Sequence, residues 1–389
     1  MGVSSPQGRF PIDVRLASSS DARASALEDA VTALLRSEIE VGSFPGAVWI
    51  VGTSEGPLVE GTIGHSVLKP AKIVATHDTI WDVASITKPL ITTALVLQTA
   101  AEGTIRLEDR VAEWLTEYRG TDKEDVTFID LLTHRAGFQA WFPLYTHGIG
   151  DAAYLQALVR RPLRYQPGTR EIYSCLGFVT LTLALERIHR EPVEALARKR
   201  IFEPLGLTTA MFSPPPSMKY RIAATEWGNA NERQMVAERN LPFRRFRNYM
   251  IWGEVNDGNA FYMGGMAGNA GLFGTAKDVF EIARHWAVGG GNLLPPEMVR
   301  LALRNYTVGF EENRGFGWIL HMSREDHPSA VLSKQCFGHT GFTGTSVWVD
   351  PPRDLIMVLL TNRLHPVVRP LNMQAIRREF HRIVLENWE

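Results

Sequence analysis

The amino-acid sequence predicts an α+β fold in which an antiparallel sheet, flanked by helices from both ends of the chain, carries an inserted, mainly helical lobe. Strand-like alternation occurs near both ends, whereas helical periodicity dominates from about residue 80 to residue 270. Strands at both ends imply that the two ends share one sheet. We therefore expect a sheet lobe from residues 1–75 and 275–389, a helical lobe from 76–274, and an active site in the cleft between them.

The individual elements follow from local patterns along the chain. After a polar leader of about twenty residues, apolar side chains at helical spacing predict a helix over residues 21–37, and a hairpin follows over residues 46–64. Further helices are predicted at residues 90–102, 128–133, 151–159, 178–188 and 371–388. Late strands are predicted at residues 317–322, 345–349 and 355–360.

Composition narrows the possible partners. The 41 basic and 42 acidic residues nearly cancel without long runs of one sign, which argues against nucleic acid or an anionic membrane as a partner. A small-molecule ester or amide is therefore the more suitable substrate. Neither a secretory signal nor an apolar stretch long enough to span a bilayer is evident, so we expect a cytoplasmic protein, of unspecified oligomeric state. The two cysteines form no Cys-x-x-Cys pair, and we expect no disulfide, metal or cofactor.

The stretch VGTSEG contains Gly-x-Ser-x-Gly around Ser54, the pattern that houses the nucleophile of many serine esterases. That function requires a turn from a strand into a helix. Strand-like residues lie on both sides of Ser54, so we interpret it as the turn residue of a hairpin.

A second serine begins a predicted helix. Ser85 and Lys88 form Ser-x-x-Lys, a spacing that places both side chains on one helical face about 5–6 Å apart at Cβ. Pro89 is best tolerated in a first turn, which places Ser85 near the start of the helix. There an unpaired backbone N–H can bind an oxyanion, and a desolvated lysine can activate the hydroxyl.

Two later motifs accompany this pair in a familiar order. Tyr173 follows Pro-Gly in PGTREIYSC, and His339 begins HTG on a late strand. With these motifs, and with segments such as LLTHRAG, EPLGL, GGMAG and TNRLHP, the chain resembles the serine β-lactamase and penicillin-binding-protein superfamily, especially its class C-like branch. That branch includes class C β-lactamases, D-Ala-D-Ala carboxypeptidases and family VIII carboxylesterases.

The resemblance implies a role for each matching residue. Ser85 would be the acylated nucleophile, Lys88 its partner in proton transfer, and Tyr173 the second general base and acid. A phenolate needs nearby positive charge, which Lys88 and a protonated His339 would supply. The backbone N–H groups of Ser85 and Phe342 would form the oxyanion hole.

Substrate contacts are expected from Thr340 and Gly341 of the HTG motif, from Cys175 and from aromatic residues. We expect an apolar acyl or aryl pocket formed by the aromatic side chains of Phe138, Trp141, Phe142 and Tyr145.

Two departures from the class C pattern bear on the substrate. His339 replaces a lysine, so a carboxylate-bearing β-lactam gains less from it. Cys175 replaces the amide residue of Tyr-Ser-Asn, and a thiol cannot reproduce the hydrogen bonds of an amide. We therefore expect a metal-independent carboxylesterase for short-chain or aryl esters. A β-lactamase, a D-amino-acid peptidase or amidase, an acyltransferase and a catalytically silent binding protein remain the alternatives.

Overall fold

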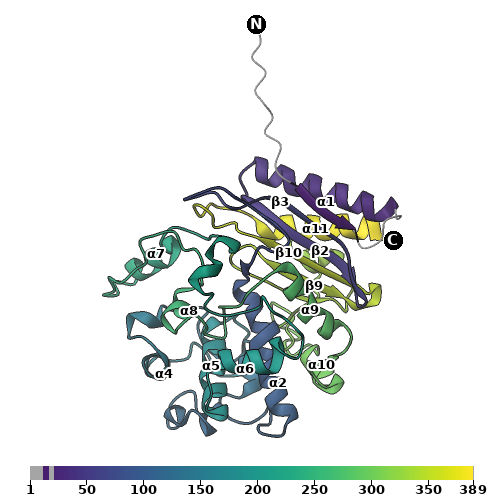
Figure 1. Cartoon of the computed structure of the whole chain (residues 1–389). Coiled ribbons are helices and arrows are strands. Elements are labelled where there is room, and N and C mark those ends of the chain that lie inside the picture. Colours follow the sequence, from purple (N-terminus) through teal and green to yellow (C-terminus); the bar gives the residue numbers. More distant parts are fainter. Residues whose placement is uncertain (1–11, 17–21, 389) are drawn as a thin grey trace.

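An antiparallel sheet of eight strands forms one end of the molecule (Figure 1). The computed structural model describes residues 12–16 and 22–388. Along the sheet the strands follow the order β1-β3-β2-β10-β9-β8-β7, and β4 pairs with β3. Their bounds are β1 (Ile12–Leu16), β2 (Gly46–Thr53), β3 (Gly56–Val67), β4 (Ile73–Val74), β7 (Ile319–Leu320), β8 (Phe337–Thr340), β9 (Ser346–Asp350) and β10 (Leu355–Thr361).

The central pairing joins the two ends of the chain. Strands β2 and β10 are antiparallel, with Val51 opposite Met357 and Val48 opposite Leu360. This pairing confirms the predicted fold class, in which early and late strands share one antiparallel sheet.

Alternate side chains of the central strands face two different layers. Trp49 and Met357 pack in a cluster with α1 (Ala22–Glu40) and α11 (Met373–Trp388), which lie side by side over the outer face (Figure 1). Val48, Ile50, Val358 and Leu360 point the other way, into the cluster that includes α9 (Ala276–Ala287) and the helical part of the chain. The period of two along each strand therefore separates the two cores.

The remaining helices gather at the opposite end of the molecule from α1 and α11 (Figure 1). Their bounds are α2 (Ala94–Ala101), α3 (Phe128–Leu132), α4 (Asp151–Arg160), α5 (Cys175–His189), α6 (Val193–Ala197), α7 (Ala230–Glu238), α8 (Gly258–Tyr262) and α10 (Pro296–Ala302). The chain leaves the sheet through β5 (Trp81–Asp82) and returns through β6 (Phe273–Gly274), and these two strands pair with each other. Both crossings between sheet and helices therefore lie together.

Two local predictions were wrong. The leader contains β1, which pairs with β3 so that Ile12 lies opposite Ile63. Five alternating residues are too few to predict a strand from the sequence. In the structure, the backbone of β1 finds its hydrogen-bond partners in β3. The strand predicted at residues 317–322 is reduced to β7, and the φ of +69° at Gly317 is not that of an extended strand.

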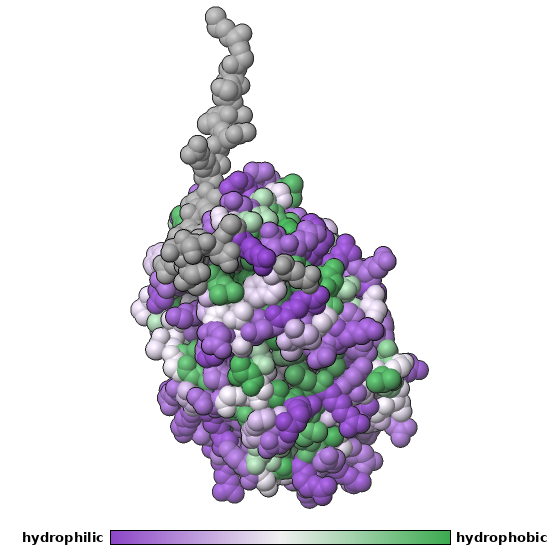
Figure 2. Space-filling view, turned by 90° about the vertical axis from the view of Figure 1, so that its right-hand side faces the viewer, coloured by the Kyte–Doolittle hydropathy of each residue, from purple (hydrophilic) through white to green (hydrophobic). Residues whose placement is uncertain are grey.

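The exterior is mixed in character. On the face drawn in Figure 2, apolar and hydrophilic side chains are interspersed. Among the helices of the described residues, none combines the length and the apolar character that a membrane span requires.

Candidate active site

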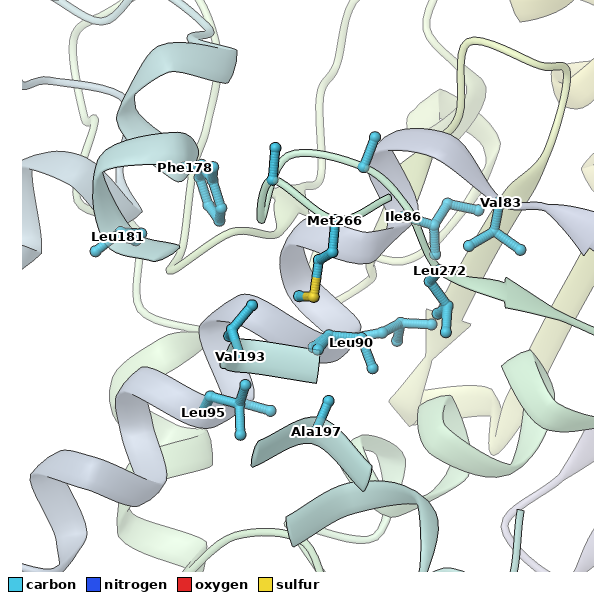
Figure 3. Packing of buried hydrophobic residues seen from close by; sticks show 14 of the residues in the cluster. Val83, Ile86, Leu90, Leu95, Phe178, Leu181, Val193, Ala197, Met266 and Leu272 are labelled. Atoms are coloured by element: carbon cyan, nitrogen blue, oxygen red, sulfur yellow. The ribbon is translucent and has the colours of Figure 1, made fainter. Parts of the chain in front are cut away.

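Ser85 lies where the chain enters the helical part. It follows β5 in a 3₁₀ turn (Ala84–Ile86), and a π-helical turn (Lys88–Thr93) then leads into α2. Figure 3 shows Ile86 and Leu90 of this run packed among buried side chains from other segments of the helical part. The run is therefore anchored by its apolar face, which fixes Ser85 in position.

The backbone just before Ser85 is strained. Ala84 has a φ of +51°, a conformation that non-glycine residues seldom adopt. The buried carboxyl of Asp82 holds it there, because its Oδ1 accepts a hydrogen bond of 2.9 Å from the Ala84 N–H and its Oδ2 accepts one of 2.7 Å from the Asn256 N–H. Burial raises the pKa of Asp82 to about 6, and these two hydrogen bonds oppose that rise.

Lys88 is completely buried beneath Ser85. Its Nζ donates a hydrogen bond of 2.9 Å to Ser85 Oγ and another of 2.9 Å to the carbonyl oxygen of Asn269. The same Nζ lies 4.8 Å from the centre of the Tyr173 ring. The structure thus brings together the serine, lysine and tyrosine of the three sequence motifs.

The protonation of this group follows from burial and mutual charge. Burial raises the pKa of the Tyr173 phenol, although Lys88 and a hydrogen bond with Ser85 act in the opposite direction. Burial disfavours the charge of Lys88, but the negative charges of ionised Cys175 and Tyr173 outweigh it and raise the lysine pKa. Tyr173 is therefore a neutral phenol at neutral pH, and its ionisation and the positive charge of Lys88 favour each other.

Two histidines flank the Tyr173 ring. The His134 ring lies 4.6 Å away between centroids and that of His339 lies 6.0 Å away. Burial and the nearby positive charges of Arg314 and Lys88 hold both imidazole pKa values well below the usual range. His339 is therefore neutral near pH 7, and the positive charge expected from a protonated His339 is absent.

Arg314 is a second cation near Tyr173. Its Cζ lies 5.2 Å from the centre of the tyrosine ring. Its Nε pairs at 3.2 Å with Glu171, two residues before Tyr173, and both side chains are almost fully buried. The ion pair therefore links the Tyr173 segment to the segment that precedes β7.

The loop after β8 packs directly against the backbone before Ser85. Thr343 Oγ1 donates a hydrogen bond of 2.8 Å to the carbonyl oxygen of Asp82, and Thr345 Oγ1 donates one of 3.0 Å to that of Val83. A Cβ on Gly341 would lie 2.5 Å from the Val83 oxygen, so only glycine fits there. The N–H of Phe342 has no hydrogen-bond acceptor among the described residues.

Cys175 is the first residue of α5 and lies beside Lys88. Burial raises the pKa of its thiol, although Lys88 and a hydrogen bond with Asn269 oppose the rise, so the thiol is neutral at pH 7. Asn269 is buried, and its Oδ1 has no partner within residues 12–16 and 22–388. The neighbours of Lys88 thus include a thiol and an amide.

Two cavities meet at Ser85, Tyr173 and Phe342. The first, of about 260 Å³ and here called the Cys175 cavity, is also lined by Trp141, Cys175 and three acidic residues, Glu226, Glu232 and Asp257. The second, of about 480 Å³ and here called the His339 cavity, is also lined by His339, Thr340, Gly341, Arg314, Arg363 and Arg377. The Cys175 cavity therefore has three acidic side chains in its wall, and the His339 cavity has three arginines together with Glu312.

The pocket expected from four aromatic residues contains one of them. Only Trp141 of the four lines the Cys175 cavity, whereas Phe138, Phe142 and Tyr145 are buried in the core. The Tyr145 hydroxyl donates to Glu232 at 2.9 Å. Burial raises the pKa of Glu232 to about 8, so this carboxyl is largely protonated at neutral pH.

Sequence reasoning missed several residues of the site because they belong to no spaced motif. His134 lies in LLTHRAG, a segment noted for its family resemblance, but only the structure shows its ring beside that of Tyr173. Arg314, Asn269 and Glu226 lie far from the motifs in sequence, and only folding brings them near Ser85. Within the described residues, no cluster of three or more His, Cys, Asp or Glu side chains is placed to hold a metal ion.

Ser54 lies elsewhere, in the turn between β2 and β3. Its Oγ donates a hydrogen bond of 3.1 Å to Asp354 Oδ2, and its N–H donates one of 2.9 Å to Oδ1 of the same carboxylate. The Gly-x-Ser-x-Gly stretch is thus a hairpin turn tied to the turn before β10.

The sequence is similar to that of known proteins over most of its length. Residues 31–379 match the family model described as Beta-lactamase. A protein of Escherichia coli K12 named "Putative D-alanyl-D-alanine carboxypeptidase" is 32% identical over 330 residues, covering 78% of this chain and 74% of that protein. A protein of the same name from Salmonella typhi is 31% identical over 331 residues, with the same two shares.

Solved structures share the fold at lower identity. A family VIII carboxylesterase has a TM-score of 0.71 at 19% identity, covering 95% of this chain and 100% of that one. The hydrolase EstCE1, described as having promiscuous acyltransferase activity, has a TM-score of 0.72 at 20% identity over 92% of this chain and 100% of its own. A penicillin-binding-protein homologue from Caulobacter crescentus has a TM-score of 0.73 at 17% identity, over 96% and 100% of the two chains. By the family match and the identity to its relatives, the chain belongs to the β-lactamase family.

Proposed function

We propose that the protein is a carboxylesterase that forms an acyl-enzyme on Ser85. The observation that carries this proposal is the contact of 2.9 Å between Lys88 Nζ and Ser85 Oγ, beside Tyr173 and at the junction of two cavities. A buried lysine and tyrosine next to an accessible serine hydroxyl form a unit that can remove and return a proton.

In the acylation step Ser85 Oγ attacks the ester carbonyl carbon. Its proton passes to the Lys88–Tyr173 pair after that pair has lost one proton to solvent. The carbonyl oxygen becomes an oxyanion, which the N–H groups of Ser85 and Phe342 stabilise. The C–O bond of the ester then breaks, and the pair returns the proton to the departing alcohol.

Deacylation repeats the steps with water. The pair takes a proton from the water, whose oxygen attacks the acyl carbon and forms a second oxyanion. When the bond to Ser85 Oγ breaks, the pair returns the proton to the serine and the carboxylic acid leaves. Neither step requires a metal or a cofactor.

The environment of Lys88 favours esters over amides. Cys175 stands where relatives with Tyr-Ser-Asn place an amide, and its neutral thiol is a weak hydrogen-bond partner. An amide substrate needs stronger orientation and stronger protonation of its leaving group than an ester does. We therefore expect a higher kcat/KM for esters than for amides.

The test is a comparison of substrate classes with the purified protein. Hydrolysis of p-nitrophenyl butyrate is measured beside that of nitrocefin and of a D-Ala-D-Ala peptide, and labelling by a fluorophosphonate probe reports the reactive serine. Ester turnover with labelling at Ser85 supports the proposal. Nitrocefin or peptide turnover at a higher kcat/KM than the ester would replace it with the activity concerned.

Two alternatives have specific support. The relatives named as D-alanyl-D-alanine carboxypeptidases favour a peptidase, which the peptide in the panel detects. The fold shared with EstCE1 favours acyl transfer, in which an alcohol or amine replaces water as the acceptor. Product analysis with added acceptors separates transfer from hydrolysis.

We expect activity to rise with pH above neutrality. Because burial raises the pKa of Tyr173, the phenolate that can accept a proton is scarce at pH 7. Its population grows up to about tenfold per pH unit until the apparent pKa of the pair is reached. A pH profile of kcat/KM from 6 to 10 on p-nitrophenyl butyrate, corrected for spontaneous hydrolysis, should therefore show a rising limb. A profile that is flat or falls above pH 7 would contradict this protonation scheme.

The Cys175→Asn variant tests the argument about amides. An amide at this position regains donors and an acceptor beside Lys88, so the ratio of amide or β-lactam turnover to ester turnover should increase by about tenfold, equivalent to about 1.4 kcal/mol. The control is Cys175→Ser, because serine is small and polar but lacks the amide. Cys336→Asn is unsuitable as a control because Cys336 is buried. An unchanged substrate ratio in the asparagine variant would show that the thiol does not limit amide turnover.

A further inference from the structure

Arg377 of α11 clamps the loop that carries Phe342. Its Nη2 donates a hydrogen bond of 3.1 Å to the carbonyl oxygen of Gly341 and one of 2.9 Å to that of Thr345. The side chain is buried, with 4% of the residue exposed. One guanidinium therefore holds both ends of the loop over residues 341–345.

Within the described part of the chain, the positive charge of Arg377 has no carboxylate partner. None of the ion pairs found among residues 12–16 and 22–388 involves Arg377, and its Nε has no hydrogen-bond partner there. Burial, with the charge of Arg363 as a second cause, lowers the pKa of Arg377 to about 9. Buried guanidinium groups are ordinarily paired, because an isolated charge in the interior is costly. The buried charge of Arg377 lowers the stability of the fold, and it lies next to the candidate active site. This position indicates that the charge has a function there.

That use follows from the geometry of the peptide unit. The Gly341 carbonyl and the Phe342 N–H belong to the same planar amide, so fixing the carbonyl also fixes the direction of the N–H. A cation that binds the oxygen also polarises the amide and makes its N–H a stronger donor. Arg363 acts on the next unit, because its Nε donates a hydrogen bond of 2.6 Å to the Phe342 carbonyl oxygen.

We propose that Arg377 is a positioning residue of the oxyanion hole, which aims and polarises the Phe342 N–H through the Gly341 carbonyl. The inference rests on the proposed acyl-enzyme chemistry of Ser85. Because the charge acts on the oxyanion and not on the neutral ester, Arg377 affects the transition state and leaves ground-state binding nearly unchanged.

The test compares Arg377→Met with Arg377→Lys and with Arg382→Met. Methionine has similar length but neither charge nor donor, lysine retains the charge, and Arg382 is an exposed arginine of the same helix that pairs with Glu379 and Glu386. We expect Arg377→Met to lower kcat for p-nitrophenyl butyrate by about 10- to 100-fold, and KM to stay within about twofold of the wild type. The loss of kcat is smaller than the loss expected when a direct donor of the oxyanion hole is removed. Arg377→Lys should recover part of this loss, and Arg382→Met should match the wild type.

Inhibition by 1-butaneboronic acid supplies the readout that a merely structural role would not change. Its boron accepts the serine oxygen and becomes a tetrahedral anion that resembles the oxyanion intermediate. The inhibition constant should rise in Arg377→Met by the same factor as kcat falls. The urea midpoint should stay near that of the wild type, because removal of an uncompensated buried charge relieves a cost.

Two results would overturn the proposal: an inhibition constant within about twofold of the wild type, or a loss of activity carried by KM alone. If Arg377→Met does not fold, Arg377→Gln, which keeps donors without charge, takes its place in the same comparison. Should the wild type bind the boronic acid but turn over no ester, the esterase proposal fails, while the inhibition constants still decide the role of Arg377.

Discussion

Ser85→Ala is expected to lower kcat/KM for p-nitrophenyl butyrate by at least about 10⁴-fold, because no other group can form the acyl-enzyme. The Lys88 ammonium would lose the hydroxyl that now accepts its hydrogen bond of 2.9 Å, but it would keep the Asn269 carbonyl oxygen. The fold should therefore persist, with its circular dichroism spectrum unchanged. Initial rates at several ester concentrations, together with fluorophosphonate labelling, measure the effect.

Ser54→Ala is the matched control, since it removes the same hydroxyl from the other serine motif. Its hydrogen bonds join two exposed turns, and bonds of this kind are worth about 0.5–1.5 kcal/mol. We expect wild-type kcat/KM within about twofold and a small loss of stability. If Ser54→Ala were inactive and Ser85→Ala active, Ser54 would be the nucleophile and the proposed site would be wrong.

Gly341→Ala is expected to lower kcat by about 10²- to 10³-fold, the loss seen when an oxyanion-hole donor is removed. A Cβ at this position would lie 2.5 Å from the Val83 carbonyl oxygen, so the loop must move away from the backbone before Ser85. That movement displaces the Phe342 N–H. Overpacking of this kind also costs about 1–3 kcal/mol of stability, which urea unfolding measures.

Gly177→Ala in α5 provides the comparison. There a Cβ meets only Leu131 at 3.5 Å, an ordinary contact, and alanine favours a helix over glycine by about 1 kcal/mol. Activity near that of the wild type and equal or higher stability are expected. Equal activity in Gly341→Ala and Gly177→Ala would exclude the loop over residues 341–345 from the oxyanion hole.

Local pattern was sufficient for the helices and strands with a clear apolar periodicity. Residues 22–37 of the amphipathic run predicted at 21–37 are part of α1, and the alternating run at residues 355–360 lies within β10. These signals are strong because one face of each element is buried against the sheet or its helices. The short β1 lacks such a periodic signal. It is defined by its pairing with β3, which is distant in sequence.

By itself the sequence determined the family, the fold class and the three motifs that contain Ser85, Tyr173 and His339, because motif spacing and hydrophobic periodicity are local properties. Only the tertiary structure decided the environment of those residues. It placed Arg314 near Tyr173, made His339 neutral, put acidic residues in the wall of the Cys175 cavity and set Arg377 of the last helix against the Gly341 carbonyl. These effects arise from burial and from charges that are distant in sequence, which no pattern along the chain records.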